Sequence, residues 1–167
     1  MESKGQARGR FRTLRKESHS PDRTAPGRFL LEAPEINSAQ VVASFTSYGD
    51  EPDTAELHKI LQSRGVTIYL PRINDDKSLT WLCNQIEVDI DKLKQVDAVI
   101  VPALAIDHRG VRLGQGGGSF DRALPALSGW KVALIDYVCF TPEELPEETH
   151  DCRVDAVATE RGIVRFN

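Results

Sequence analysis

Cysteine is scarce in this chain of 167 residues: there are three, Cys83, Cys139 and Cys152, and no two of them form a Cys-x-x-Cys pair. An odd, widely spaced set disfavours both a disulfide scaffold and a zinc site, so we expect a reducing, cytoplasmic compartment. Long apolar runs are also lacking. No stretch of 18 apolar residues occurs, so we expect no membrane contact, and no apolar segment follows the basic start, as a secretory signal would require.

Charge is distributed unevenly along the chain. The total is −4, but residues 1–28 contain eight Lys or Arg and three Asp or Glu, a net +5, which leaves −9 for the remainder. Composition predicts a basic, partly disordered arm over residues 1–28 and a single α/β domain over residues 29–167. The alternative is that the arm supplies cations to an anionic ligand. The acidic remainder and the few aromatic residues in the arm argue against a nucleic-acid partner.

Periodicity in the remaining sequence indicates alternating strands and helices. We expect a strand–helix–strand unit, a continuous apolar strand buried on both faces, a helix after it and two further strands. Residues 72–94 are ambiguous, although Trp81, Leu82, Ile86 and Ile90 are compatible with an irregular helix. The sequence therefore predicts an open, mostly parallel α/β sheet with helices on both faces in a single domain. The expected strands are residues 38–48, 66–71, 97–106, 130–137 and 154–160, and the expected helices are residues 53–65 and 120–127.

The segment RLGQGGGSFDR, residues 112–122, has four glycines within five residues. It does not fit the Walker pattern, which needs Gly-Lys-Ser/Thr, and Ser119 stands where the dinucleotide pattern needs its third glycine. Clustered glycines form either a flexible turn or a nest of backbone N–H groups that binds phosphate. Asp121 either caps a helix or binds Mg²⁺ beside the phosphates, and Arg122 is either solvated or a fork for phosphate oxygens.

Several separated motifs together resemble one enzyme family. VPALAIDHRGVRLGQGGGSFDRAL is similar to a strand ending in P-x-L-A-x-D followed by G-x-R-L-G-x-G-G-G-Y-Y-D-R. FRTLRK resembles an N-terminal K-x-x-L-R, and SYGDEPDTAELHKILQSRGVTIYLPRI resembles a helix that follows an E-P/V-D-T motif. LTW and LPEETHDCRVDAVATERGIV complete the match. These are motifs of the 5-formyltetrahydrofolate cyclo-ligase family, and the resemblance spans nearly the whole chain in the right order.

The resemblance implies a monomeric enzyme that uses ATP and Mg²⁺ to convert 5-formyltetrahydrofolate to 5,10-methenyltetrahydrofolate. It implies metal binding by Asp121 and Asp151, substrate binding by Glu51 with Ser119 and Phe120, and catalytic roles for Arg112 and Arg122 at the transferring phosphoryl group. The residues it assigns to ATP are Arg12, Arg15, Gly114, Gln115, Gly116, Gly117, Gly118, Ser119 and Phe120.

Three departures from the family pattern fall on ligand contacts. Ser119 and Phe120 replace two tyrosines, Phe11 stands at the place of the N-terminal lysine, and the stretch from Trp81 to Asp97 is short. The alternative to an active cyclo-ligase is therefore a diverged paralogue that binds nucleotide or folate with little or no turnover.

Overall fold

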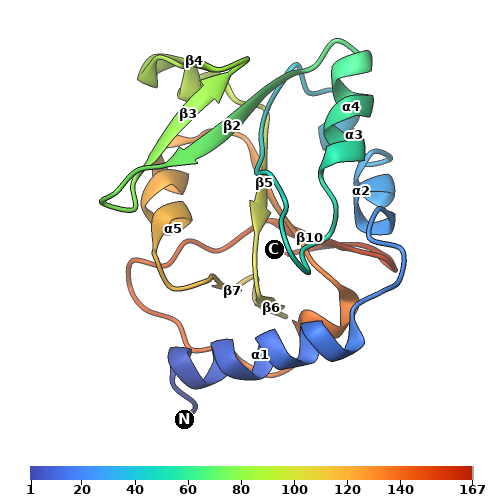
Figure 1. The fold of residues 1–167 in the computed structure, drawn as a ribbon, viewed down its shortest axis with the longest axis vertical. Coiled ribbons are helices and arrows are strands. Elements are labelled where there is room, and N and C mark those ends of the chain that lie inside the picture. Colours follow the sequence, from blue (N-terminus) through green and yellow to red (C-terminus); the bar gives the residue numbers. More distant parts are fainter. Residues whose placement is uncertain (167) are drawn as a thin grey trace.

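Five parallel strands form the centre of the structure, a computed structural model that describes residues 1–166 (Figure 1). The eight-stranded sheet has the order β11-β10-β8-β5-β1-β2-β3-β4; β10 to β2 are parallel, and β11, β3 and β4 are antiparallel to their neighbours. A small second sheet has the order β7-β6-β9. The strands are β1 (Val41–Ala43), β2 (Thr67–Ile73), β3 (Leu79–Cys83), β4 (Ile86–Glu87), β5 (Ala98–Pro102), β6 (Ala105–Asp107), β7 (Arg112–Leu113), β8 (Trp130–Leu134), β9 (Phe140–Thr141), β10 (Ala156–Thr159) and β11 (Gly162–Arg165).

Alternate residues of the central strand β5 enter two separate cores. Val99 and Val101 pack on one face of the sheet, and Ala98 and Ile100 pack on the other, as expected for a parallel strand covered on both sides. Helices α2 (Ala25–Leu30), α3 (Pro34–Asn37) and α4 (Ala55–Ser63) lie together on the second face (Figure 1). Helices α1 (Lys4–Ser18) and α5 (Ser119–Ala123) contribute to the core of the first face. The predicted fold class is confirmed.

Several predicted elements differ from the observed ones. The continuous strand expected over residues 97–106 divides into β5 and β6, which belong to different sheets, and the strand expected over residues 38–48 contains only the three residues of β1. The irregular helix considered for residues 72–94 is wrong, because this segment forms the hairpin of β3 and β4 before the 3₁₀ helix η1 (Ile90–Gln95). Asn84 and Gln85 make its turn with positive φ angles of 50° and 70°. The other 3₁₀ segments are η2 (Leu124–Ala126) and η3 (Tyr137–Cys139).

The N-terminal segment differs from the partly disordered arm that its composition suggests. It contains the helix α1, which begins with a capping box between Ser3 and Gln6. Ala7, Phe11 and Arg15 recur every four residues, which places them on one helical face, and all three are buried. The boundary expected between residues 28 and 29 lies inside α2. Within residues 1–166 no helix is both long and apolar enough to cross a membrane.

The burial of Phe11 makes α1 testable as part of the folded core. Its side chain is 1% exposed, so Phe11→Ala should lower the free energy of unfolding by about 3–5 kcal/mol. Urea unfolding followed by circular dichroism measures this change. Thr13→Ala, at an exposed position of the same helix, is the control and should have little effect. An unchanged stability for Phe11→Ala would show that α1 is not docked.

Candidate functional site

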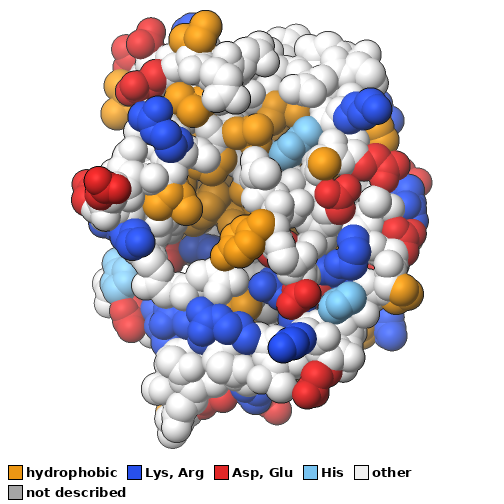
Figure 2. All heavy atoms as spheres, in the orientation of Figure 1, with side chains coloured by type: hydrophobic (Ala, Val, Ile, Leu, Met, Phe, Trp, Pro, Cys, Tyr) orange, Lys and Arg blue, Asp and Glu red, His pale blue; other side chains and the backbone are white. Residues whose placement is uncertain are grey.

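A pocket of about 530 Å³ lies between the glycine loop, the loop after β1 and helix α1. Figure 2 shows the hollow with an apolar floor and with Lys and Arg side chains along the edge where Figure 1 places α1. The carboxyl ends of parallel strands meet along this edge of the sheet, where open α/β proteins bind ligands. The predicted site residues among its lining are Glu51, Arg112, Gly114, Gln115, Gly116, Gly117, Gly118, Ser119, Phe120, Asp121 and Asp151.

The glycine loop, residues 114–118, is held in place by cations from α1. Arg8 Nε donates to the carbonyl oxygen of Gly114 at 2.9 Å, and Arg12 Nη2 donates to the carbonyl oxygen of Gln115 at 3.0 Å. Gly116 has a φ of +116° and Gly118 a φ of +69°, conformations that glycine adopts without the strain a side chain would bring. The backbone is therefore shaped and fixed, which favours a nest of N–H groups over a flexible turn.

Arg112 lies almost completely buried at the inner end of the glycine loop. Its side chain is 3% exposed; Nη2 pairs with Asp121 Oδ1 at 3.0 Å, and Nη1 donates to the carbonyl oxygen of Pro102 at 3.1 Å. Nε, in contrast, is a buried donor without a hydrogen-bond partner among residues 1–166. An unsatisfied buried donor is costly.

Asp151 is a second carboxylate of the pocket and pairs with the N-terminal helix. Lys4 Nζ donates to its two oxygens at 2.8 and 2.7 Å, and the backbone N–H of Glu148 donates at 2.7 Å. Burial alone would raise the pKa of Asp151, but these hydrogen bonds lower it below the ordinary value. The carboxylate is therefore ionised, as a metal ligand must be.

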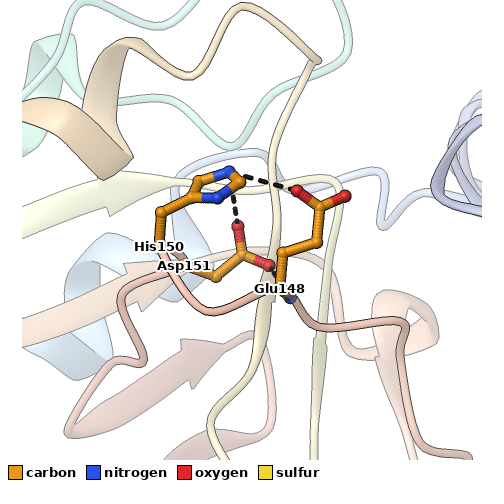
Figure 3. A group of neighbouring side chains, drawn as sticks. All are labelled: Glu148, His150 and Asp151. Carbon is orange, nitrogen blue, oxygen red and sulfur yellow. Dashed lines mark hydrogen bonds and ion pairs between the residues drawn. The ribbon is translucent and has the colours of Figure 1, made fainter.

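The two predicted metal ligands approach each other without sharing one cluster. The backbone N–H of Cys152 donates to Asp121 Oδ1 at 3.2 Å, so Asp121 contacts the residue next to Asp151. Among the described residues, however, the side chains whose ligand atoms lie within 4.8 Å of one another are Glu148, His150 and Asp151 (Figure 3). The carboxylate oxygens suit Mg²⁺, whereas the imidazole suits it less well.

Glu51 lines the pocket from the loop before α4. It is 8% exposed, and Oε1 accepts a hydrogen bond from the backbone N–H of Tyr48 at 3.1 Å. Burial raises its pKa, and the hydrogen bond and the charge of Arg15 only partly oppose this effect. A buried carboxylate with a raised pKa is suited to hydrogen-bonding a neutral N–H donor of a ligand. Phe120 adds an aromatic wall, edge-on to Trp81 with the ring centroids 6.2 Å apart.

Three of the predicted site arginines are outside the pocket lining that the described residues form. Arg12 is exposed and contacts Gln115, and Arg15 is buried within the α1 packing. Arg122 is also exposed; its Nη2 donates at 3.2 Å to the carbonyl oxygens of Gly117 and Asp76, so it braces the outside of the loop. Their proposed contacts with ATP remain predictions.

Sequence reasoning missed two cations that do line the pocket, Lys4 and Arg8. They are four residues apart and therefore share one face of α1. A sequence signal for them exists: on a helix, Lys4 and Arg8 lie next to the apolar residues Ala7 and Phe11. Phe11, which stands at the place of the family's N-terminal lysine, is a core residue, and Lys4 supplies an ammonium group to the pocket.

Comparisons with known proteins agree on one family. A family model described as the 5-formyltetrahydrofolate cyclo-ligase family matches residues 82–160. The 5-formyltetrahydrofolate cyclo-ligase of Escherichia coli is 30% identical over 151 residues, which cover 78% of this chain and 83% of that protein. The enzyme of the same name from Mycolicibacterium smegmatis is 29% identical over 153 residues and covers 76% and 77% of the two chains.

Solved structures share the fold. A 5,10-methenyltetrahydrofolate synthetase from Aquifex aeolicus superposes with a TM-score of 0.82 at 22% identity, over 98% of this chain and 93% of the other. One from Mycoplasma pneumoniae gives a TM-score of 0.80 at 14% identity, over 95% and 99%. At these identities the likeness concerns the fold alone.

The buried carboxylate of Glu51 generates a prediction about stability. Its pKa is raised in the folded state, so the folded protein binds the proton more tightly than the unfolded chain and loses stability as pH rises through the folded pKa. Glu51→Gln removes that charge and should raise the melting temperature at pH 7–8, with a gain that vanishes below the unfolded pKa. Thermal unfolding from pH 4 to pH 8 measures this dependence.

The exposed Glu56 provides the control, since Glu56→Gln should leave the same curve unchanged. A loss of stability at pH 8 for Glu51→Gln would contradict the burial argument.

Proposed function

This chain belongs to the 5-formyltetrahydrofolate cyclo-ligase family, and from that membership we propose the reaction in full: 5-formyltetrahydrofolate and ATP become 5,10-methenyltetrahydrofolate, ADP and phosphate, with Mg²⁺ required. The single observation that carries the proposal is one pocket lined by two chemically different groups of residues. One group, called the phosphate end, is the glycine loop with Arg112 and Lys4; the other, called the folate end, is Glu51 with the apolar lining that includes Phe120. A triphosphate suits the first end and a pterin suits the second.

The proposed chemistry requires no protein nucleophile. The formyl oxygen attacks the γ-phosphorus and ADP leaves; N10 then attacks the activated formyl carbon and loses its proton, and the formyl oxygen departs with phosphate. The protein must align two ligands and neutralise charge on the transferring phosphoryl group. Arg112 lines the pocket and carries a positive charge for that purpose, and the N–H groups of residues 114–118 add to it. Glu51 holds the pterin through ring N–H donors, and Ser119 and Phe120 contact the substrate.

Asp121 and Asp151 are the proposed magnesium ligands. Both line the pocket as carboxylates, and both are held by cations that also suit phosphate, Asp121 by Arg112 and Asp151 by Lys4. When bound, the metal would neutralise phosphate charge. The two aspartates contribute carboxylate oxygens beside the glycine loop that would hold the phosphates. Such oxygens are the ligands that Mg²⁺ prefers.

The binder without turnover is the second candidate, and one observation favours it. Ser119 lines the pocket with a small hydroxyl side chain, where a tyrosine would add a ring against the substrate. In either case we propose a protein that acts as a cytoplasmic monomer without a nucleic-acid partner. We also propose that residues 1–28 belong functionally with the domain formed by residues 29–167, because Lys4 and Arg8 line the same pocket.

Direct assay separates the two candidates. Purified protein with 5-formyltetrahydrofolate and Mg-ATP should produce the near-ultraviolet absorbance of the methenyl product, and omission of Mg²⁺ should abolish it. ATP binding without product at high enzyme concentration would favour the binder and contradict the cyclo-ligase.

Asp121→Asn tests the metal assignment with a nearly isosteric side chain. It should lower kcat by about 10²-fold, the scale seen when one group that stabilises transition-state charge is lost, and leave the far-ultraviolet circular dichroism spectrum intact. Asp91→Asn, at an exposed acid in η1, is the matched control. Equal activity of the two variants would remove Asp121 from the site.

A further inference from the structure

Two pairs of a buried aspartate and an arginine lie outside the pocket lining that the described residues form. Asp107 pairs with Arg109, and Asp136 pairs with Arg23. The pairs are matched in burial: both aspartate side chains are 0% exposed, and the arginines are 23% and 22% exposed. Burying an ion pair seldom adds stability compared with apolar packing. Their contacts indicate another use.

The Asp107–Arg109 pair joins the turn between β6 and β7 to the segment after β9. Asp107 accepts from the backbone N–H groups of Arg109 and Val111 at 2.9 and 3.1 Å, and also from that of Leu145 at 3.0 Å. Arg109 Nη2 donates to Asp107 at 2.7 Å and to the carbonyl oxygen of Leu145 at 2.9 Å. One carboxylate thus holds two segments that are far apart in sequence.

Both of these segments lead directly into the phosphate end of the pocket. Arg112 and the glycine loop follow the β6–β7 turn, and Glu148, His150 and Asp151 follow Leu145. A further contact lies beyond them, where the backbone N–H of Val154 donates to the carbonyl oxygen of Gly110 at 2.9 Å. The relative position of Arg112 and Asp151 therefore depends on this junction.

The Asp136–Arg23 pair makes a comparable junction at the other end. Asp136 accepts from the backbone N–H of Ser20 at 3.1 Å and from both Nη1 and Nη2 of Arg23. Arg23 Nη2 also donates to the carbonyl oxygen of Asp50, and the carbonyl oxygen of Arg23 accepts from the backbone N–H of Asp53 at 2.8 Å. Glu51, which lines the pocket, lies in the chain between Asp50 and Asp53, the two residues that Arg23 holds.

We propose that the two pairs position the two ends of the pocket independently: Asp107 and Arg109 set the phosphate end, and Asp136 and Arg23 set the folate end. All four are positioning residues, since they act through Arg112, Asp151 and Glu51. The assignment of ATP to one end and folate to the other rests on the proposed function. The two junctions are linked at one place, where β9 follows Asp136 in the chain and pairs with Asp107; their separate action rests on the side-chain contacts described above, which share no residue.

Charge-conserving variants of the two arginines test the proposal. Lysine keeps the charge but lacks the planar fork that donates to a carboxylate and a carbonyl at once. Arg109→Lys should raise KM for Mg-ATP about tenfold and leave KM for 5-formyltetrahydrofolate within about twofold. Arg23→Lys should do the reverse. Each variant is the matched control of the other, because the two arginines are similarly exposed and similarly paired.

A purely structural role would change both KM values together, or neither, in both variants, and that result would overturn the proposal. If lysine restores enough contacts to hide the effect, Asp107→Asn and Asp136→Asn place an NH₂ group among donors and break the same junctions. No selectivity in this second pair would also overturn it.

Amide hydrogen exchange tests the independence of the junctions without any ligand. Arg109→Lys should speed exchange in residues 112–118 and 144–154 and leave residues 47–53 unchanged, and Arg23→Lys should give the opposite pattern. Failure of the wild-type protein to bind Mg-ATP or 5-formyltetrahydrofolate would remove the proposed function. The exchange pattern would still decide the positioning proposal, and uniform acceleration in either variant would overturn it.

Discussion

The buried guanidinium of Arg112 is the group on which the site depends. It pairs with Asp121 across the glycine loop and reaches back to the carbonyl oxygen of Pro102 at the end of β5. The loop is thereby closed at both ends and fixed to the central strand. Removing a charge from water costs several kcal/mol of free energy, and its interactions with partner groups must offset about that amount. Arg112 is paired through Nη1 and Nη2, whereas its buried Nε has no hydrogen-bond partner in the described chain. The protein thus keeps a paired, buried cation at the pocket to which the proposed reaction brings anions.

Helix α1 completes the pocket by adding two cations, Lys4 and Arg8, to the Arg112 that the acidic remainder of the chain supplies there. Ala7 and Phe11 fasten the helix to the core, so that the neighbouring turns present Lys4 and Arg8 to the pocket. Lys4 then pairs with Asp151, and Arg8 holds the carbonyl oxygen of Gly114. The charge asymmetry of the sequence thus has a structural use: the basic segment and the acidic domain meet at the ligand site.

Local patterns predicted the elements whose structure depends on neighbours in sequence. The apolar stripe of α4 and the β-branched run of β5 follow from residue spacing, and the positive φ angles at Gly116 and Gly118 are of the kind that clustered glycines allow. The helix expected within residues 72–94 was wrong because this segment pairs with itself and with the end of β2. Arg72 and Ile73 of β2 pair with Thr80 and Leu79 of β3, and β3 pairs in turn with β4. The apolar residues of these short strands also fit a helical spacing, and strand preference depends on the pairing partners more than on the segment itself.

The sequence by itself determined the fold class and the family, and most of the site residues it predicted line the pocket, because motifs report local chemistry and strand–helix alternation limits the topology. Only the tertiary structure decided which charges face each other. Lys4 and Asp151 are 147 positions apart, and Arg23 and Asp136 are 113 apart. No spacing rule connects such residues. Their contacts exist because the sheet brings its strand ends to one edge, and the buried aspartates then fix the segments that meet there.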